Sequence, residues 1–261
     1  MAAKKPTGTI TRGTTNPNRL RRVDRYIAAL PVIREPNAVV VDLGFGASPI
    51  TAVELLSRLE KINPSLHVVG IEIERERVER GLAVATEHLH FVHGGFEVPL
   101  PSQFSRASLI RAFNVLRQYD EIEVAAAWNL MQSRLSDDGI LIEGTCDEIG
   151  RLSCWVTLDK NAPQSLTISL RLSGLEIPSK VAERLPKVLI HRNVPGEKIN
   201  EFLNSLDAAW KNHSGMAVFG ATQRWISVCK DMRNQGWPLV GDFKRWRLGE
   251  ISVNWSAVAP L

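Results

Sequence analysis

Between residues 38 and 145 the sequence alternates between short apolar runs and segments with helical periodicity, and this alternation constrains the fold more than any other feature. Apolar strands separated by helices are typical of a parallel sheet with crossover helices, and right-handed crossovers place such strands in one twisted sheet. We therefore expect an α/β fold. The expected strands are residues 38–43, 67–73, 89–93, 108–113 and 140–143. The expected helices between them are residues 50–62, 75–88 and 121–135, and the expected turn before the last strand is 137–139.

The chain of 261 residues, 44% of them apolar, is long enough for one main domain with accessory elements. It contains no uninterrupted apolar run of about 18 residues and no apolar centre of a signal peptide near its start. Its three cysteines are an odd number without CxxC spacing, which fits neither a disulfide framework nor a zinc knuckle. We expect a cytoplasmic protein with reduced cysteines.

The expected organisation has three parts. Residues 1–17 lack apolar periodicity and are predicted to be a flexible basic arm. Residues 18–195 are expected to form the main domain, which includes a β-hairpin of residues 152–158 and 166–172 and a last strand at 188–191. Residues 196–261 are expected to be a helical, tryptophan-rich extension packed on that domain. Its five tryptophans are expected to pack in the core; stacking on the bases of RNA is the alternative.

Positive charge is concentrated at the two ends of the chain. Residues 1–25 carry seven basic side chains against one acid, a net charge of +6, whereas residues 26–186 come to −6 and residues 187–261 to +4. A basic arm can attract the phosphates of RNA, but a solvated leader of the same composition is equally compatible with the sequence. The candidate RNA contacts are Lys4, Lys5, Arg12, Arg19, Arg21 and Arg22.

The first expected strand runs into an acidic residue and two glycines, Asp42, Gly44 and Gly46, before a helix. Such a turn lets the backbone approach a ligand closely. A phosphate loop would need Gly-Lys-Ser/Thr, which is missing, and a dinucleotide fingerprint would need glycine or alanine where Pro49 stands. A pyrophosphate would also lie near the Asp42 carboxylate, whereas the sulfonium and ammonium of S-adenosylmethionine would be attracted to it.

These residues resemble the first motif of the class I S-adenosylmethionine-dependent methyltransferases. Glu72 stands at the end of the second strand, where the family has an acidic residue that binds the ribose hydroxyls, while Ser48 replaces a frequent third glycine. The resemblance covers about residues 38–145 and implies a Rossmann-like class I methyltransferase fold with helices on both faces of the sheet. The cofactor-binding residues that it implies are Asp42, Gly44, Phe45, Gly46, Glu72, Ile73, Gly95, Phe96 and Asn114.

The reaction implied is methyl transfer to an unidentified acceptor, a small molecule or RNA, with Asn114 or Tyr119 as catalytic residues that orient the nucleophile. The Asn/Asp-Pro-Pro-aromatic motif of base methylases is absent, since Val115 and Leu116 follow Asn114. Two other functions stay open: a binding protein with the same core but no catalysis, and an RNA-binding protein that uses the basic arm. We expect no metal, because the nearby histidines 88, 90 and 93 do not share one strand face.

Overall fold

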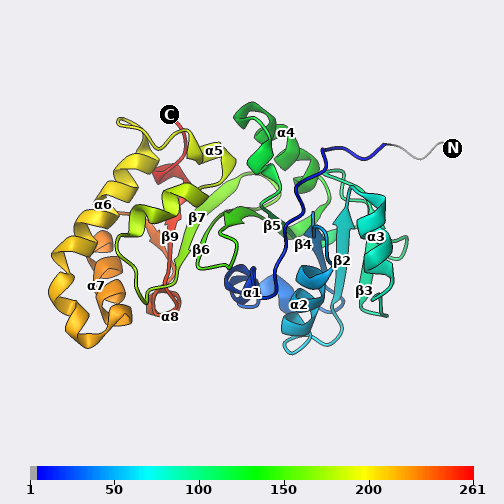
Figure 1. Cartoon of the computed structure of the whole chain (residues 1–261), viewed down its shortest axis with the longest axis horizontal. Coiled ribbons are helices and arrows are strands. Elements are labelled where there is room, and N and C mark those ends of the chain that lie inside the picture. The colour runs from blue at the N-terminus through cyan, green and yellow to red at the C-terminus, as the bar shows by residue number, and fades with distance from the viewer. Residues whose placement is uncertain (1–4) are drawn as a thin grey trace. The chain divides into compact units, whose positions relative to one another are not determined.

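A computed structural model describes residues 5–261, which divide into two compact units (Figure 1). The first unit comprises residues up to 143 together with 148–150 and 158–162, and the second comprises 144–147, 151–157 and 163–261. The division therefore falls inside a strand near residue 143, whereas the sequence suggests a boundary at residue 195. Each unit is described separately below.

The first unit contains five neighbouring strands of a nine-stranded sheet, in the order β3-β2-β1-β4-β5. Its strands are β1 (Val39–Leu43), β2 (His67–Glu72), β3 (Leu89–His93), β4 (Ala107–Phe113) and β5 (Leu135–Cys146), the last of which ends in the second unit. Its helices are α1 (Arg21–Ile27), α2 (Ile50–Leu59), α3 (Arg75–Leu82) and α4 (Glu121–Gln132), with 3-10 helices at Pro31–Arg34 and Leu116–Gln118.

Strand β1 lies at the centre of this sheet and pairs in parallel with β2 on one side and β4 on the other. Val41 is opposite Val69 of β2 and Ile110 of β4, and all three side chains are fully buried. The order 3-2-1-4-5 is that of a doubly wound Rossmann-like sheet, and its direction reverses between β1 and β4. The α/β fold predicted from the alternation is thus confirmed, while the predicted turn at residues 137–139 is wrong, because these residues continue β5.

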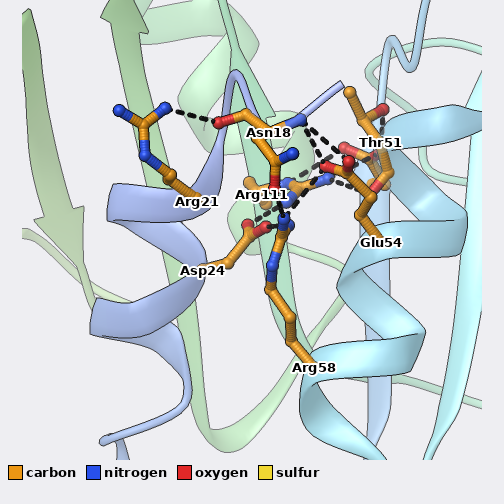
Figure 2. A network of polar contacts seen from close by, with 8 residues as sticks. Asn18, Arg21, Asp24, Thr51, Glu54, Arg58 and Arg111 are labelled. Atoms are coloured by element: carbon orange, nitrogen blue, oxygen red, sulfur yellow. Dashed lines mark hydrogen bonds and ion pairs between the residues drawn. The ribbon is translucent and has the colours of Figure 1, made fainter. Parts of the chain in front are cut away.

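A buried ion-pair network joins α1, α2 and β4 within the first unit (Figure 2). Arg111 of β4 is fully buried and pairs with Asp24 of α1 and with Asp42 of β1, whose Oδ2 lies 2.7 Å from Arg111 Nη2. Arg58 of α2 pairs with the other oxygen of Asp24. Burial raises the pKa of Asp24, and although burial alone would lower the pKa of Arg111, its two carboxylate partners outweigh burial and raise it.

The same network fixes Asn18, three residues before α1. The Asn18 main-chain N–H donates to both carboxylate oxygens of Glu54, at 2.8 and 3.0 Å, and Arg58 Nη2 donates to Asn18 Oδ1 at 2.9 Å (Figure 2). Asn18 has φ +60°, a left-handed conformation that asparagine tolerates. The chain therefore has a fixed anchor at Asn18, immediately after the segment predicted to be a free arm.

The second unit contains the end of β5 and four further strands in the order β6-β7-β9-β8. Strand β9 is antiparallel to both β7 and β8. The elements are β6 (Leu152–Leu158), β7 (Pro163–Leu170), β8 (Leu239–Val240), β9 (Glu250–Asn254), α5 (Lys187–Ile190), α6 (Lys198–Asn212), α7 (Ala221–Asn234) and α8 (Phe243–Trp246). Its 3-10 helices are Pro178–Arg184, Ser214–Phe219 and Trp255–Ala257.

Three of the five tryptophans predicted to lie in the core are buried in this second unit, whereas Trp237 and Trp255 are half-buried. Trp210, Trp225 and Trp246 are at most 4% exposed, and the first two rings meet edge to face with centroids 6.2 Å apart. The Trp225 indole N–H donates to the Glu250 carbonyl at 3.2 Å. The strand predicted at residues 188–191 is wrong, because Lys187–Ile190 is a short helix that begins directly after Pro186. No helix within residues 5–261 is long and apolar enough to cross a membrane.

Candidate functional site

The glycine turn after β1 has the conformation expected from its sequence. Gly44 has φ +72° and Gly46 has φ +85°, values that residues with a Cβ rarely adopt. The Gly44 N–H donates to the Ile71 carbonyl of β2 at 2.7 Å, and a Cβ on Gly44 would lie 2.7 Å from Val115 Cγ2. The turn thus lies between the ends of β2 and β4, and Gly44 lines the pocket that is formed there.

Glu72, the last residue of β2, lies beside this turn with its side chain buried. Its Oε2 accepts a hydrogen bond from the Gly46 N–H at 2.9 Å, and its Oε1 accepts one from the Ile73 N–H, also at 2.9 Å. Arg77 Nη1 lies 3.7 Å from Oε1. A carboxylate has about four acceptor positions, so Glu72 can accept a further bond from a hydroxyl of a ligand.

Two aromatic residues, Phe96 and Tyr119, line the same pocket as Glu72. Phe96, in the loop after β3, meets Tyr119 edge to face with ring centroids 5.3 Å apart. Tyr119 is positioned by the helix that follows, because a reciprocal capping box between Asp120 and Glu123 fixes the start of α4 one residue later. In the same loop as Phe96, the buried and β-branched Val98 has φ +45°, a strained conformation of the kind that occurs at functional sites.

These elements surround the pocket at the carboxyl ends of β1, β2, β3 and β4. This is where the strand order reverses and where ligands of doubly wound sheets bind. Among the described residues that line it, Glu72 is the one carboxylate, and lysine and arginine are absent. The lining residues are Thr7, Gly8, Thr9, Thr11, Leu43, Gly44, Glu72, Ile73, Gly94, Gly95, Phe96, Val115 and Tyr119.

The structure brings most of the residues predicted from the sequence together in this pocket. Those that line it are Gly44, Glu72, Ile73, Gly95, Phe96 and Tyr119. Four others do not line it. Gly46 lies against Gly13 of the N-terminal segment, and Phe45 packs in the core against Phe91. Asn114 directly follows β4 and has φ +60°. Asp42 is the fourth, and its position changes the interpretation.

Asp42, which the sequence predicts to face the ligand, does not line the pocket and has partners inside the protein. Its side chain is buried, accepts a 2.7 Å hydrogen bond from the Thr51 hydroxyl and pairs with Arg111 through both oxygens. Arg111 compensates its charge inside the protein, so the attraction expected between Asp42 and a cationic ligand does not arise. Glu72 is the carboxylate of the pocket.

The sequence prediction missed the contribution of the N-terminal segment. Residues 5–16, which we call the N-terminal strap, follow the ends of the strands and lead into α1, whereas the sequence suggests a free arm; Figure 1 draws them in dark blue. Four strap residues, Thr7, Gly8, Thr9 and Thr11, line the pocket. The strap binds mainly through its main chain, which leaves no apolar periodicity in the sequence to indicate it. Its content of glycine and threonine was the feature of the sequence that could have indicated the strap.

The basic residues considered for RNA binding have different environments. Lys4 lies outside the described residues, while Lys5 and Arg12 are exposed. Arg22 is buried and donates to the Gly150 carbonyl at 3.0 Å, and Arg21 donates to the Ile149 carbonyl at 2.9 Å. Arg21 and Arg22 therefore contribute to holding α1 in the first unit.

A cluster of histidines lies at the other end of β2 and β3. The rings of His67 and His88 stack with centroids 4.7 Å apart, and His90 Nε2 lies 3.3 Å from His67 Nδ1. Burial lowers the pKa of both His67 and His90, which favours their neutral forms. His93 instead contacts the Ile73 carbonyl at 2.9 Å. Within the described residues, no three His, Cys, Asp or Glu side chains are grouped so that they could hold a metal ion.

No protein-family model and no curated protein matches this chain. Solved structures that match part of it include the complex between the Haloferax volcanii Trm112 methyltransferase activator and the putative methyltransferase, at 20% identity and a TM-score of 0.38, over 49% of this chain and 52% of that one. Magnesium protoporphyrin IX methyltransferase from Synechocystis PCC 6803 with bound SAH matches at 16% identity and a TM-score of 0.38, over 49% and 54%. Human N-acetylserotonin methyltransferase in complex with SAM matches at 20% and 0.36, over 51% and 36%. The matched part spans little more than half of each of these chains, or less.

Proposed function

We propose that the protein is an S-adenosylmethionine-dependent methyltransferase that acts on a small molecule or an RNA. The observation that carries this proposal is Glu72, the one carboxylate among the described residues that line a pocket at the switch point of a doubly wound sheet; none of those residues is basic. Glu72 is placed to bind a ribose hydroxyl of a nucleoside, and Pro49 stands where a dinucleotide fingerprint would need glycine or alanine, which disfavours the pyrophosphate of NAD or FAD. The pocket suits a nucleoside with free ribose hydroxyls and a positively charged end.

The residues of the pocket fit the parts of this cofactor. Glu72 has one acceptor position left for a ribose hydroxyl, on Oε2, since the N–H groups of Gly46, Ile73 and Glu74 use the others. The left-handed Gly44 leaves main chain exposed beside the pocket, where a side chain would fill the space. Phe96 and Tyr119 offer ring surfaces on which a base or an aromatic acceptor can stack.

When bound, S-adenosylmethionine supplies a methyl group on a sulfonium, which an acceptor can displace in line. The protein's part is to hold the acceptor at attack distance and to exclude water. Tyr119 lines the pocket through a ring that is 8% exposed, and we assign it the role of orienting the acceptor. Asn114 stays a proposed second positioning residue, because it directly follows β4 next to Val115, which lines the pocket.

Isothermal titration with S-adenosylmethionine tests the proposal. Glu72→Gln should weaken binding by about 10- to 100-fold, because hydrogen bonds to a charged acceptor contribute about 1.5–3 kcal/mol. Glu76→Gln on α3, an exposed acid, is the matched control and should bind as the wild type does. Equal affinity in Glu72→Gln, or tighter binding of NAD than of S-adenosylmethionine, would contradict the proposal.

Turnover distinguishes the enzyme from the alternative of a binding protein. Formation of S-adenosylhomocysteine over a panel of small molecules and RNAs should identify the acceptor, and binding without turnover on every acceptor would favour the non-catalytic protein. Interaction of RNA with the basic arm stays a prediction, for which Lys5 and Arg12 are the exposed candidates among the described residues. Cytoplasmic location likewise stays a prediction.

A further inference from the structure

The N-terminal strap occupies the main-chain donors around the candidate cofactor groove. The Ala47 N–H, just after the glycine turn, donates to the Gly13 carbonyl at 2.9 Å. At the other end of the groove the Phe96 N–H donates to the Thr7 carbonyl, also at 2.9 Å. The strap therefore uses the exposed amide at each end of the groove, the groups that a bound ligand would need.

Between these two ends, side chains of the first unit hold the strap in place. The Thr9 N–H donates to the Tyr119 hydroxyl at 2.6 Å, and Gln118 Nε2 donates to Thr9 Oγ1 at 2.9 Å. Arg77 Nη2 donates to the Thr11 carbonyl at 3.0 Å. Most of these contacts involve the main chain of the strap, so the path of its backbone matters more than its side chains.

At Gly95 and at Gly46 the strap lies too close to the first unit for a ligand to lie between them. A single added carbon on Gly95 would lie 2.0 Å from the Thr7 carbonyl oxygen, and one on Gly46 would lie 2.8 Å from the Gly13 carbonyl oxygen. An adenine ring or a ribose is larger than a single carbon atom. At both ends of the groove the strap and a nucleoside cofactor therefore exclude each other.

The strap can leave the groove without unfolding α1. Its last residues precede Asn18, which Glu54 and Arg58 anchor through three hydrogen bonds of 2.8–3.0 Å (Figure 2). Release of residues 5–16 breaks the contacts described above and leaves that anchor intact. Glycines within the strap, Gly8 at φ +133° and Gly13 at φ +70°, have conformations that other residues rarely adopt, so the docked path depends on them.

We propose that the N-terminal strap is an inhibitory segment that fills the cofactor groove of the free protein and that S-adenosylmethionine must displace. This inference rests on the proposed function. If only a fraction of the molecules is open, the apparent affinity for the cofactor is the intrinsic affinity multiplied by that fraction. Removing the segment therefore raises the affinity by the inverse of the fraction. Closure in nine molecules out of ten would correspond to a factor of about ten, or about 1.4 kcal/mol.

The test compares the affinity for S-adenosylmethionine in four proteins: the full chain, a chain lacking residues 1–15, Gly13→Ala and Gly174→Ala. In Gly13→Ala the new Cβ would lie 2.6 Å from the Arg77 guanidinium carbon at a left-handed φ, so the strap should dock poorly. Gly174 has a similar φ of +74° and no heavy atom within 4 Å of the added carbon, which makes it the matched control in the second unit.

We expect the truncated chain to bind about tenfold more tightly or better, Gly13→Ala to bind more tightly by about fivefold, and Gly174→Ala to bind as the wild type does. Because Gly13→Ala keeps the whole chain, it decides the question even if the truncated chain does not fold. Equal or weaker binding by Gly13→Ala would overturn the strap inference and leave the proposed function standing. Absence of binding in all four proteins would refute the proposed function, and with it the competition.

Trypsin cleavage after the exposed Arg12 gives a second readout that follows the strap itself. Saturating S-adenosylmethionine should accelerate this cleavage in the full chain, because the displaced strap becomes accessible to the protease. Amide hydrogen exchange of Ala47 and Phe96 should also rise in the truncated chain without cofactor, since both amides lose their carbonyl partners. Slower cleavage at Arg12 with cofactor would mean that the strap closes over the ligand, and would overturn the inference.

Discussion

A buried carboxyl in β5 should give the first unit a steep dependence of stability on pH. Glu143 is fully buried, and burial raises its pKa from 4.5 to about 8, with a hydrogen bond from Trp128 offsetting part of the shift. At neutral pH the folded protein therefore keeps this carboxyl protonated, whereas the unfolded chain ionises it. Folding then takes up a proton, and the free energy of unfolding must fall as pH rises.

The size of the effect follows from the two pKa values. Below pH 4.5 the carboxyl is protonated in both states and adds no pH dependence. From there to about pH 8 each pH unit lowers the free energy of unfolding by about 1.4 kcal/mol. The loss reaches about 3 kcal/mol at pH 7 and about 5 kcal/mol above pH 8, where the folded state also ionises.

Glu143→Gln should remove this dependence, because the amide is neutral at every pH and its oxygen can still accept the bond from Trp128. Urea unfolding of both proteins, followed by circular dichroism at several pH values, measures the difference. The variant should match the wild type near pH 4.5 and exceed its stability by about 3 kcal/mol at pH 7. Glu79→Gln, an exposed acid on α3, is the control. A constant difference between wild type and Glu143→Gln across that range would refute the reasoning.

Two further predictions concern packing in the first unit. Arg111→Leu should lower the free energy of unfolding by about 3–5 kcal/mol, because Asp24 and Asp42 would be left buried without their shared cation; unchanged urea unfolding would contradict this. Gly70→Ala in β2 should cost about 1–3 kcal/mol in thermal unfolding, because its Cβ would lie 2.7 Å from the Phe91 ring, and a loss below about 0.5 kcal/mol would show that the ring moves aside freely.

The sequence predicts the sheet and the glycine turn well because both depend on local patterns. A buried apolar strand followed by glycines with left-handed φ has a clear signature at Gly44, and the position of Glu72 follows from the end of the next strand. The partner of Asp42 was beyond prediction, since Arg111 lies 69 residues away within an apolar strand, where a charged residue reads as an interruption. Short elements such as Lys187–Ile190 also defeat periodicity, because four residues do not distinguish helix from strand.

The position of the strap could not be predicted from the sequence for a different reason. Its contacts run through carbonyl and amide groups that every residue carries, so composition and periodicity give no indication of where it lies. What the sequence does contain is a run of small and flexible residues, and the same run is typical of disordered tails.

The close fit of the strap on the groove also bears on how the protein can change during evolution. Gly95 lies against the strap and also lines the pocket, so a substitution there would alter strap docking and ligand binding at once, whereas Gly46 lies against the strap outside the pocket lining. Gly13 sits on the strap side and touches the first unit through Arg77, outside the pocket lining. If the strap inhibits as proposed, natural variants can adjust the resting fraction of open molecules through strap residues such as Gly13, while Gly95 is constrained by both the strap and the ligand.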